Sequence, residues 1–396
     1  MLGNPIVVLS DSLQGGAANA TTHLAEGLAA AGTPLERWHL SPAQRTTPIR
    51  EISLDPRLKR PPFERLIKNI SLPAANRLRH KRHLLAFQKQ LAKTQPPLLN
   101  LHNIHDSGLN HDSIPPGIPL IWTLHDRWPF APEAYVWQDT NLNSKQFAAP
   151  DRPFTTAREK RARFFIRQAP TVLVAPSQWL ADEARHHAPE QIRIEHVPYG
   201  IDLDAFAPQC PTESRNTLQL DPKRIWIGHA STWANSRKGF DILARALNQV
   251  DCSKIGLLLW GQRPTDPLPS KLDTQFLGHI QDTKKLSQLY SACHLFLCPS
   301  RADNLPNTVL ESLACGTPII GSQAGGIPDM VRPTHTGWLF SGDIPDSCAQ
   351  ALLRAFSDQD AWPEFRTRCR KLAKSEYSMQ LQASRYQQLI AQLTNK

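Results

Sequence analysis

The sequence lacks several features that would assign it to common classes of protein. Nowhere do about 18 apolar residues run together, so no segment is predicted to cross a membrane as a helix. The N-terminus has neither a basic segment nor a long apolar one, and we expect no signal peptide. The seven cysteines are scattered without a C-x-x-C pair, which disfavours structural zinc and disulfides and favours a reducing cytoplasm.

The composition is that of a globular chain. Forty per cent of the 396 residues are apolar, and the length exceeds that of one ordinary core, so two domains are expected. The formal net charge is +10, and 50–93 holds twelve Lys and Arg against three acids. This excess would attract phosphates of lipid headgroups, nucleic acid or an anionic substrate. A solvated basic face is the plain alternative, and no nucleic-acid recognition motif is present.

Short apolar runs alternate with helical patterns along the chain. In the first half, strands are predicted at 6–12, 97–103, 119–126 and 171–177, with helices at 18–31 and from Ser177 onward. In the second half, strands are predicted at 225–231, 254–262, 274–280, 294–300 and 317–322, with helices at 238–249, 282–292 and 306–315. Strands separated by helices imply parallel sheets covered on both faces, here as two doubly wound α/β domains.

Such sheets bind ligands where strand ends lead into helices, and several polar loops lie at these points. Gly15 and Gly16 precede a helix and permit close backbone approach, but the full G-x-G-x-x-G pattern is absent. His125 ends a strand, the position expected for a functional residue. The alternative is a histidine that only hydrogen-bonds to backbone carbonyl groups. His102 and His105 follow another strand, and with no third ligand we expect no metal site.

Two further loops are suited to an anionic, hydroxyl-rich ligand. Arg237 and Lys238 precede a helix, where cations are disfavoured unless an anion binds there. Asp303 follows the strand at 294–300, and Glu311 lies eight residues later. Carboxylates accept hydrogen bonds from ligand hydroxyls, and the backbone amides of 304–308 would donate to a phosphate or a sugar. The alternative for Glu311 is a capping box with Thr308. The turn at 324–329 follows the next strand and is expected to line the same site.

Taken in their order along the chain, these glycine, histidine, basic and acidic segments resemble those of the family 4 glycosyltransferases of the GT-B fold. The resemblance covers nearly the whole chain. The strongest parts are PSRADNLPNTVLESLACGTPIIGSQAGGIPDMV (299–331), RKGFDIL (237–243) and VPYGIDLDAF (197–206). NLHNIHDSG and WTLHDRWPF are similar to the subgroup that builds bacterial exopolysaccharides, such as colanic acid-type enzymes. The resemblance implies two Rossmann-like domains facing across a cleft: 1–198 on the acceptor side, 199–377 for the nucleotide sugar, and a terminal helix in 378–396 that crosses back.

The resemblance also assigns roles to residues. The family's two glutamates, separated by seven residues, fall on Asp303 and Glu311, which implies contacts to the donor sugar and to the ribose respectively. Lys238 matches the lysine that binds the diphosphate, whereas the usual Gly-Arg reads Ala230-Ser231 and the hinge asparagine reads Tyr199. The implied catalytic residues are His125 and Asp303, and the implied donor-binding residues are Gly15, Gly16, Arg237, Lys238, Asn304, Leu305, Pro306, Asn307, Thr308 and Glu311.

The expected function is therefore a retaining hexosyltransferase of cell-surface polysaccharide synthesis. It would use a nucleotide-diphosphate sugar and a glycan or lipid-linked acceptor, with no cofactor and no metal. A cytoplasmic location is expected, with peripheral contact between 50–93 and the anionic inner face of the cytoplasmic membrane. Three alternatives stay open: an idle GT-B scaffold that binds nucleotide or sugar, an epimerase or phosphorylase on the same fold, and a binder of anionic polymers such as nucleic acid.

Overall fold

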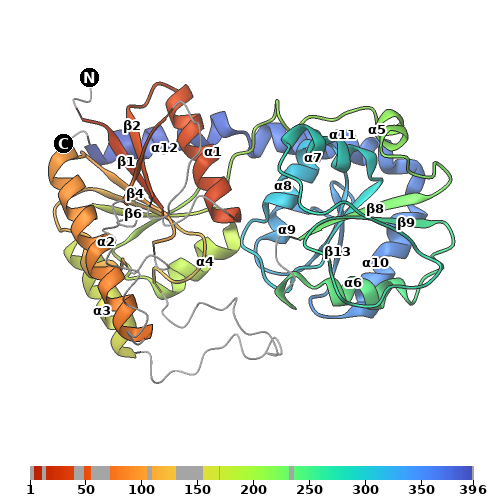
Figure 1. Cartoon of the computed structure of the whole chain (residues 1–396), viewed down its shortest axis with the longest axis horizontal. Coiled ribbons are helices and arrows are strands. Elements are labelled where there is room, and N and C mark those ends of the chain that lie inside the picture. Colours follow the sequence, from red (N-terminus) through yellow and green to blue (C-terminus); the bar gives the residue numbers. More distant parts are fainter. Residues whose placement is uncertain are drawn as a thin grey trace, which may run out of the picture.

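We describe a computed structural model of the chain. The described residues are 4–10, 15–39, 49–54, 72–104, 109–130, 155–168, 170–231 and 236–394, without the side chains of 72–80, 155–158, 231 and 236. Within these ranges every strand pair of two sheets is parallel. The sheets lie in two domains placed side by side (Figure 1).

The first sheet belongs to the N-terminal domain. Its order in space is β3 (Arg50–Ser53), β2 (Leu35–His39), β1 (Ile6–Ser10), β4 (Leu99–Leu101), β5 (Leu120–Thr123), β6 (Thr171–Ala175) and β7 (Arg193–His196). One core on this sheet includes α1 (Gly16–Ala30) and α12 (Met379–Thr394), and a second includes α2 (Leu72–Thr94), α3 (Thr155–Arg167) and α4 (Gln178–His187). The helices therefore cover both faces.

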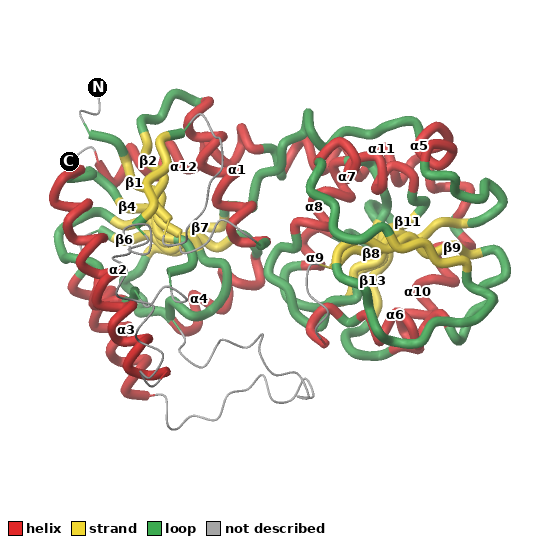
Figure 2. Tube along the Cα trace, in the orientation of Figure 1, coloured by secondary structure: helices red, strands yellow, loops and turns green. Residues whose placement is uncertain are grey.

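The second sheet belongs to the C-terminal domain. Its order is β10 (Asp273–Phe276), β9 (Ile255–Gly261), β8 (Ile225–Ser231), β11 (Leu295–Cys298), β12 (Ile319–Ser322) and β13 (Gly337–Phe340). Figure 2 shows helices on both sides of these strands. They are α5 (Pro211–Thr217), α6 (Phe240–Leu247), α7 (Thr283–Ala292), α8 (Asn307–Ala314), α9 (Ile327–Met330), α10 (Pro345–Ser357) and α11 (Trp362–Glu376), with short 3-10 helices at Ser236–Lys238 (η7) and Gln359–Ala361 (η8). A further 3-10 helix, His111–Ser113 (η4), lies between β4 and β5 of the first sheet.

The predicted doubly wound architecture is confirmed, but four strands were not predicted. β2, β3 and β7 read LERWH, REIS and RIEH, where charged residues break the apolar pattern. Cross-strand ion pairs offset the charges of β2 and β3, because Arg37 lies 3.5 Å from Glu51 and Arg50 lies 2.9 Å from Glu36. In β7, Arg193 pairs with Glu195 of the same strand over 2.6 Å. β13 is a four-residue edge strand. Short or charged strands near a sheet edge bury too little apolar surface to give a sequence signal.

The C-terminal helix α12 returns from the second domain and packs on α1 of the first (Figure 1). Ala383, Leu389 and Ile390 share a core with Leu24 and Leu28. Each fully buried Leu or Ile side chain in this core contributes roughly 1.5–3 kcal/mol. The domain boundaries at 198/199 and 377/378 stay predictions.

Candidate active site

Asp303 and Lys238 meet at the ends of two adjacent strands. Lys238 follows β8 and Asp303 follows β11, and these strands are paired. The Lys238 Nζ atom lies 2.6 Å from Asp303 Oδ2, and Arg237 Nη1 lies 3.7 Å from Oδ1. Burial opposes ionisation of the Asp303 carboxyl, but Lys238 and Arg237 outweigh it, so the pKa of Asp303 is lowered.

Gly239 explains how the two cations reach this loop. Its φ is +68°, and a Cβ atom there would lie 1.9 Å from the Pro299 carbonyl oxygen. Only glycine fits both the left-handed backbone and the close approach. Arg237 Nη1 also donates to the Ala302 carbonyl oxygen over 3.1 Å, which fixes the guanidinium against the loop that carries Asp303.

Glu311 lies on the second turn of α8 and does not form a capping box. The N-cap is Pro306, and no side chain caps the helix, so the capping alternative with Thr308 is wrong. Instead, the Tyr290 hydroxyl donates to Glu311 Oε2 over 2.6 Å. Burial raises the pKa of Glu311 to about 7, against the opposing effect of the Tyr290 hydrogen bond. Sequence reasoning missed Tyr290, whose position in a helix gave no functional signal.

The loop between Asp303 and α8 joins the two domains. Asn304 is 6% exposed, accepts a hydrogen bond from Ser177 Oγ over 2.6 Å, and donates to the His125 carbonyl oxygen over 3.1 Å. Asn307 Nδ2 donates to the Gly16 carbonyl oxygen over 3.0 Å. Ser177 caps α4 as predicted, by accepting from Leu180 N, but its second role as a link between domains was missed.

The remaining predicted residues lie around the same interface. Gly15 has a φ of +92° at the start of α1, the conformation that favours glycine. Leu305 and Pro306 are buried and Thr308 is half-buried. In the turn at 324–329, a Cβ on Gly325 would lie 1.9 Å from the Asp303 carbonyl oxygen, so this turn packs directly under the site loop.

His125 is held by two side chains that sequence reasoning did not connect with it. Its Nε2 atom lies 2.9 Å from His102 Nδ1, and its Nδ1 atom lies 2.6 Å from the Tyr199 hydroxyl oxygen. The Tyr199 and His125 rings stack with centroids 5.5 Å apart. His102, considered above only as a metal ligand, is instead part of a hydrogen-bonded cluster. No group of three or more His, Cys, Asp or Glu suited to a metal occurs within the described ranges.

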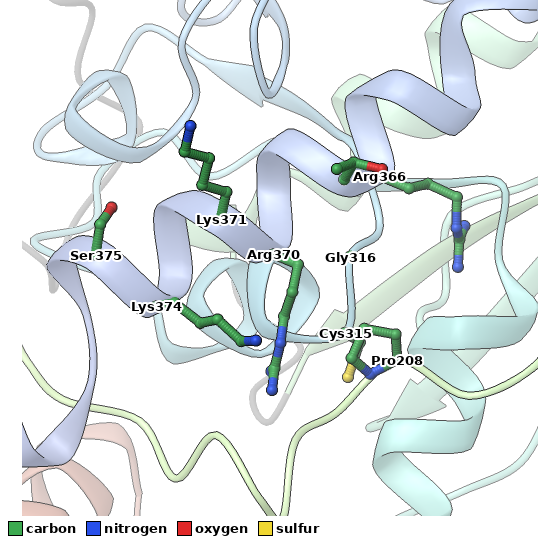
Figure 3. Close-up of a pocket in the computed structure, with 9 residues that line it drawn as sticks. Pro208, Cys315, Gly316, Arg366, Arg370, Lys371, Lys374 and Ser375 are labelled. Atoms are coloured by element: carbon green, nitrogen blue, oxygen red, sulfur yellow. The ribbon is translucent and has the colours of Figure 1, made fainter.

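A cavity of about 640 Å³ lies at the other end of α8 (Figure 3). It is lined by Pro208, Cys315, Gly316, Arg366, Thr367, Arg370, Lys371, Lys374 and Ser375. Both arginine side chains in this lining already hydrogen-bond to backbone carbonyl oxygens of the protein. Arg366 donates to the carbonyl oxygens of Ser291 and Cys293, and Arg370 donates to that of Ala314, so they satisfy the ends of α7 and α8. This cavity is not part of the candidate active site.

Two family models match successive parts of the chain. Residues 14–205 match the model described as "Glycosyltransferase Family 4", and residues 222–358 match "Glycosyl transferases group 1". A D-inositol 3-phosphate glycosyltransferase of Rhodococcus opacus (strain B4) is 24% identical over 255 residues, covering 60% of this chain and 56% of that protein. The match thus spans little more than half the length of this curated relative.

Solved structures match over nearly the full length. A sucrose-phosphate synthase from Thermosynechococcus elongatus gives a TM-score of 0.74 at 22% identity, covering 99% of each chain. HepE from Anabaena, solved in complex with UDP-glucose, gives 0.69 at 16% identity and covers 98% of this chain and 100% of the other. These structures show the GT-B fold. Among the described residues, no helix is both long and apolar enough to cross a membrane.

Proposed function

We propose that this chain, which belongs to the family 4 glycosyltransferases of the GT-B fold, transfers a hexosyl unit from a nucleotide-diphosphate sugar, with retention, to a glycan or lipid-linked acceptor. The observation that supports this most is the cluster of Arg237, Lys238 and Asp303 at adjoining strand ends. His125 and Gly16 of the other domain are hydrogen-bonded to the same loop. These contacts support a site in which the groups proposed to bind the diphosphate lie beside those proposed to bind the sugar.

The charges in this cluster suit a diphosphate leaving group. Two cations face one carboxylate, so the three groups keep a net charge of +1. Negative charge develops on the diphosphate as the sugar–phosphate bond breaks, and cations already in place lower that barrier. We propose that Arg237 and Lys238 bind the diphosphate together with amides of 304–308, and that the site works without a metal.

Asp303 and Glu311 are proposed to bind hydroxyls of the donor. When Lys238 pairs with the diphosphate instead of with Asp303, the Asp303 carboxylate can accept hydrogen bonds from the sugar hydroxyls. Glu311 would accept hydrogen bonds from the ribose.

The acceptor hydroxyl would attack from the side of the leaving group, and the diphosphate would take its proton. Asp303→Ala is then expected to reduce kcat, and Glu311→Ala to weaken donor binding; unchanged kinetics in both variants would contradict these roles.

The first experiment is thermal unfolding with UDP, GDP, ADP and their sugar conjugates. UDP-glucose is the natural first probe, because the Anabaena structure contains it. A ligand at one hundred times its Kd stabilises the protein by about 2.7 kcal/mol. We expect one nucleotide to stabilise the wild type but neither Lys238→Ala nor Glu311→Ala. No stabilisation by any of them would overturn the proposal.

A transfer assay follows with the nucleotide sugar that binds. D-inositol 3-phosphate is one acceptor to include, since the curated relative is named for it. The anomeric configuration of the product, read by NMR, tests retention. Full activity after treatment with EDTA tests metal independence.

An idle scaffold is the second candidate, and one observation favours it. In this structure Asp303 and Lys238 neutralise one another, and both ring nitrogens of His125 contact protein groups. Such a protein would bind nucleotide without turnover. Nucleotide stabilisation together with no transfer to any acceptor, and no slow hydrolysis of the sugar, would favour this reading.

We also propose that 50–93 contacts an anionic membrane surface from the cytoplasmic side. Residues 55–71 and the side chains of 72–80 lie outside the described part. Farther along α2, Lys81 is exposed and the Leu85 side chain is 56% exposed. A basic segment with a projecting apolar residue suits an interfacial position. Liposomes with and without anionic lipid test this by flotation. Leu85→Gln should weaken binding, whereas Leu353→Gln, which is 51% exposed on the other domain, should not.

A further inference from the structure

Four side chains form a hydrogen-bonded row beside the candidate active site. Thr21 of α1 lies 3.0 Å from His102 Nδ1, which lies 2.9 Å from His125 Nε2. His125 Nδ1 in turn lies 2.6 Å from the hydroxyl of Tyr199. Thr21, His102 and Tyr199 are at most 5% exposed, so three of the four side chains are shielded from water. The row connects the first domain to the segment that leads into the second.

The protons of this row can be assigned from its first member. Thr21 donates its hydroxyl proton to the Ala17 carbonyl oxygen over 2.8 Å, so its oxygen accepts from His102 Nδ1. His102 is neutral, because burial, and then His125 and Arg37, hold its pKa well below the usual value. Its proton is therefore on Nδ1 and its Nε2 is bare. This agrees with Nε2 being buried with no hydrogen-bond partner in the described structure.

The assignment determines the state of His125. The His102 Nδ1–H group also faces His125 Nε2, which must accept, because two N–H groups would repel at 2.9 Å. The proton of His125 then lies on Nδ1 and points at the Tyr199 oxygen. Burial, and then Tyr386, Asp126 and Asp303, raise the pKa of Tyr199 well above its usual value. The phenol thus stays neutral and accepts this proton through a lone pair.

We infer that Tyr199 is a positioning residue, whose phenol oxygen accepts from His125 Nδ1–H and so fixes the orientation of the ring, while the His102 Nδ1–H group fixes its tautomer. The inference rests on the proposed function for its catalytic consequence, since it concerns one of the two residues that the family resemblance implies to be catalytic. Tyr199 occupies the position at which the family resemblance expects asparagine. The tautomer itself is a property of the folded protein and is testable without any substrate.

The first test is NMR of the full chain labelled with ¹⁵N at histidine. Long-range ¹H–¹⁵N correlations distinguish a protonated ring nitrogen from a bare one, and loss of signals in His125→Gln assigns the residue. We expect wild-type His125 to be protonated at Nδ1 and bare at Nε2. Protonation at Nε2 would overturn the inference, whatever the variants do.

The second test is Tyr199→Phe, which keeps the stacked ring and removes the oxygen. We expect His125 to stay protonated at Nδ1, because His102 still donates to its Nε2, but its ring signals should shift. We also expect a loss of about tenfold in kcat, the effect of one hydrogen bond, with a smaller change in the KM of the nucleotide sugar. Tyr377→Phe is the matched control. It removes another buried phenol oxygen, which donates to the Asp329 carbonyl oxygen over 3.2 Å outside the row, and should leave the His125 signals unchanged.

The outcomes separate this inference from the proposed function. A shift of the His125 ring signals in Tyr199→Phe, in a protein that transfers no sugar, would support the positioning role while the proposed function fails. His125 ring signals that do not move in Tyr199→Phe would overturn the positioning role even in an active enzyme. If Tyr199→Phe does not fold, the wild-type tautomer and Tyr199→Asn decide in the same way, with the His125 ring signals of Tyr199→Asn again expected to shift.

Discussion

Donor binding is predicted to depend on pH through Glu311. The pKa of this carboxyl is raised to about 7 by burial, while the ribose hydroxyls are proposed to donate hydrogen bonds to its ionised form. A ligand that prefers the carboxylate must remove the proton when it binds at lower pH. Affinity should therefore be full above the pKa and fall as the pH drops through 7.

The magnitude follows from the ionised fraction. With a pKa of about 7, roughly 76% of Glu311 is ionised at pH 7.5 and roughly 3% at pH 5.5. If the protonated form does not bind, affinity falls about 25-fold between these values, which corresponds to about 1.9 kcal/mol. Near pH 6, about one proton should be released for each ligand bound.

Isothermal titration calorimetry measures both quantities. The ligand should be a nucleotide-diphosphate sugar, because the terminal phosphate of a free nucleoside diphosphate titrates near pH 6 by itself. Repeating the titration in two buffers of different ionisation enthalpy counts the released protons. Binding that is equally tight at pH 5.5 and 7.5, with no proton released, would refute the reasoning.

Two variants make the test specific to this carboxyl. Glu311→Gln cannot ionise, so its affinity should be weak and independent of pH. Tyr290→Phe removes the hydrogen bond that lowers the pKa of Glu311, and should move the midpoint to higher pH. A pH dependence that persists unchanged in Glu311→Gln would assign the effect to another group.

Three predictions concern the folded structure. Lys238→Met leaves the Asp303 carboxylate without its ion-pair partner at 2.6 Å, and should cost about 1–3 kcal/mol in urea unfolding, part of which Asp303→Asn restores in the double variant. Asn304→Ala removes hydrogen bonds between the domains, and should increase the radius of gyration measured by small-angle X-ray scattering; an unchanged radius would show that other contacts suffice. Leu313→Ala, at a fully buried site, should cost about 2–5 kcal/mol, whereas the exposed Leu353→Ala should change stability by less than about 0.5 kcal/mol by the same measurement.

The sequence predicts best what depends on local pattern and on the rules of parallel sheets. β9 reads IGLLLWG and is buried nearly throughout, so its apolar run is visible without a structure. The meeting of Lys238 with Asp303 follows from one further step, because polar loops after neighbouring parallel strands end at the same edge. Strands such as β3 cannot be predicted from local pattern, because their charged residues are paired only with residues of a neighbouring strand.

Contacts that depend on how helices and domains pack could not be predicted. Tyr290 lies 21 positions before Glu311, and Tyr199 lies 74 positions after His125. Nothing in either local pattern indicates the partner, because the pairing is decided by which faces of the elements become buried together. The error at Thr308 has a local cause: α8 begins at Asn307 with Pro306 as its N-cap, so Thr308 lies inside the first turn and cannot form a capping box.

The return of α12 to the first domain has a consequence for the order of folding during synthesis. The core beside α1 needs Ala383 and Leu389, and the Tyr386 hydroxyl hydrogen-bonds to Thr123 across that core over 2.8 Å. These residues are translated after the whole second sheet. While the ribosome is still making that sheet, the N-terminal domain therefore exposes the apolar groove that α12 later covers. Exposed apolar surface on a nascent chain is where chaperones bind. A chain shortened before Met379 would remain in that state, and the second domain would have no means of completing the first.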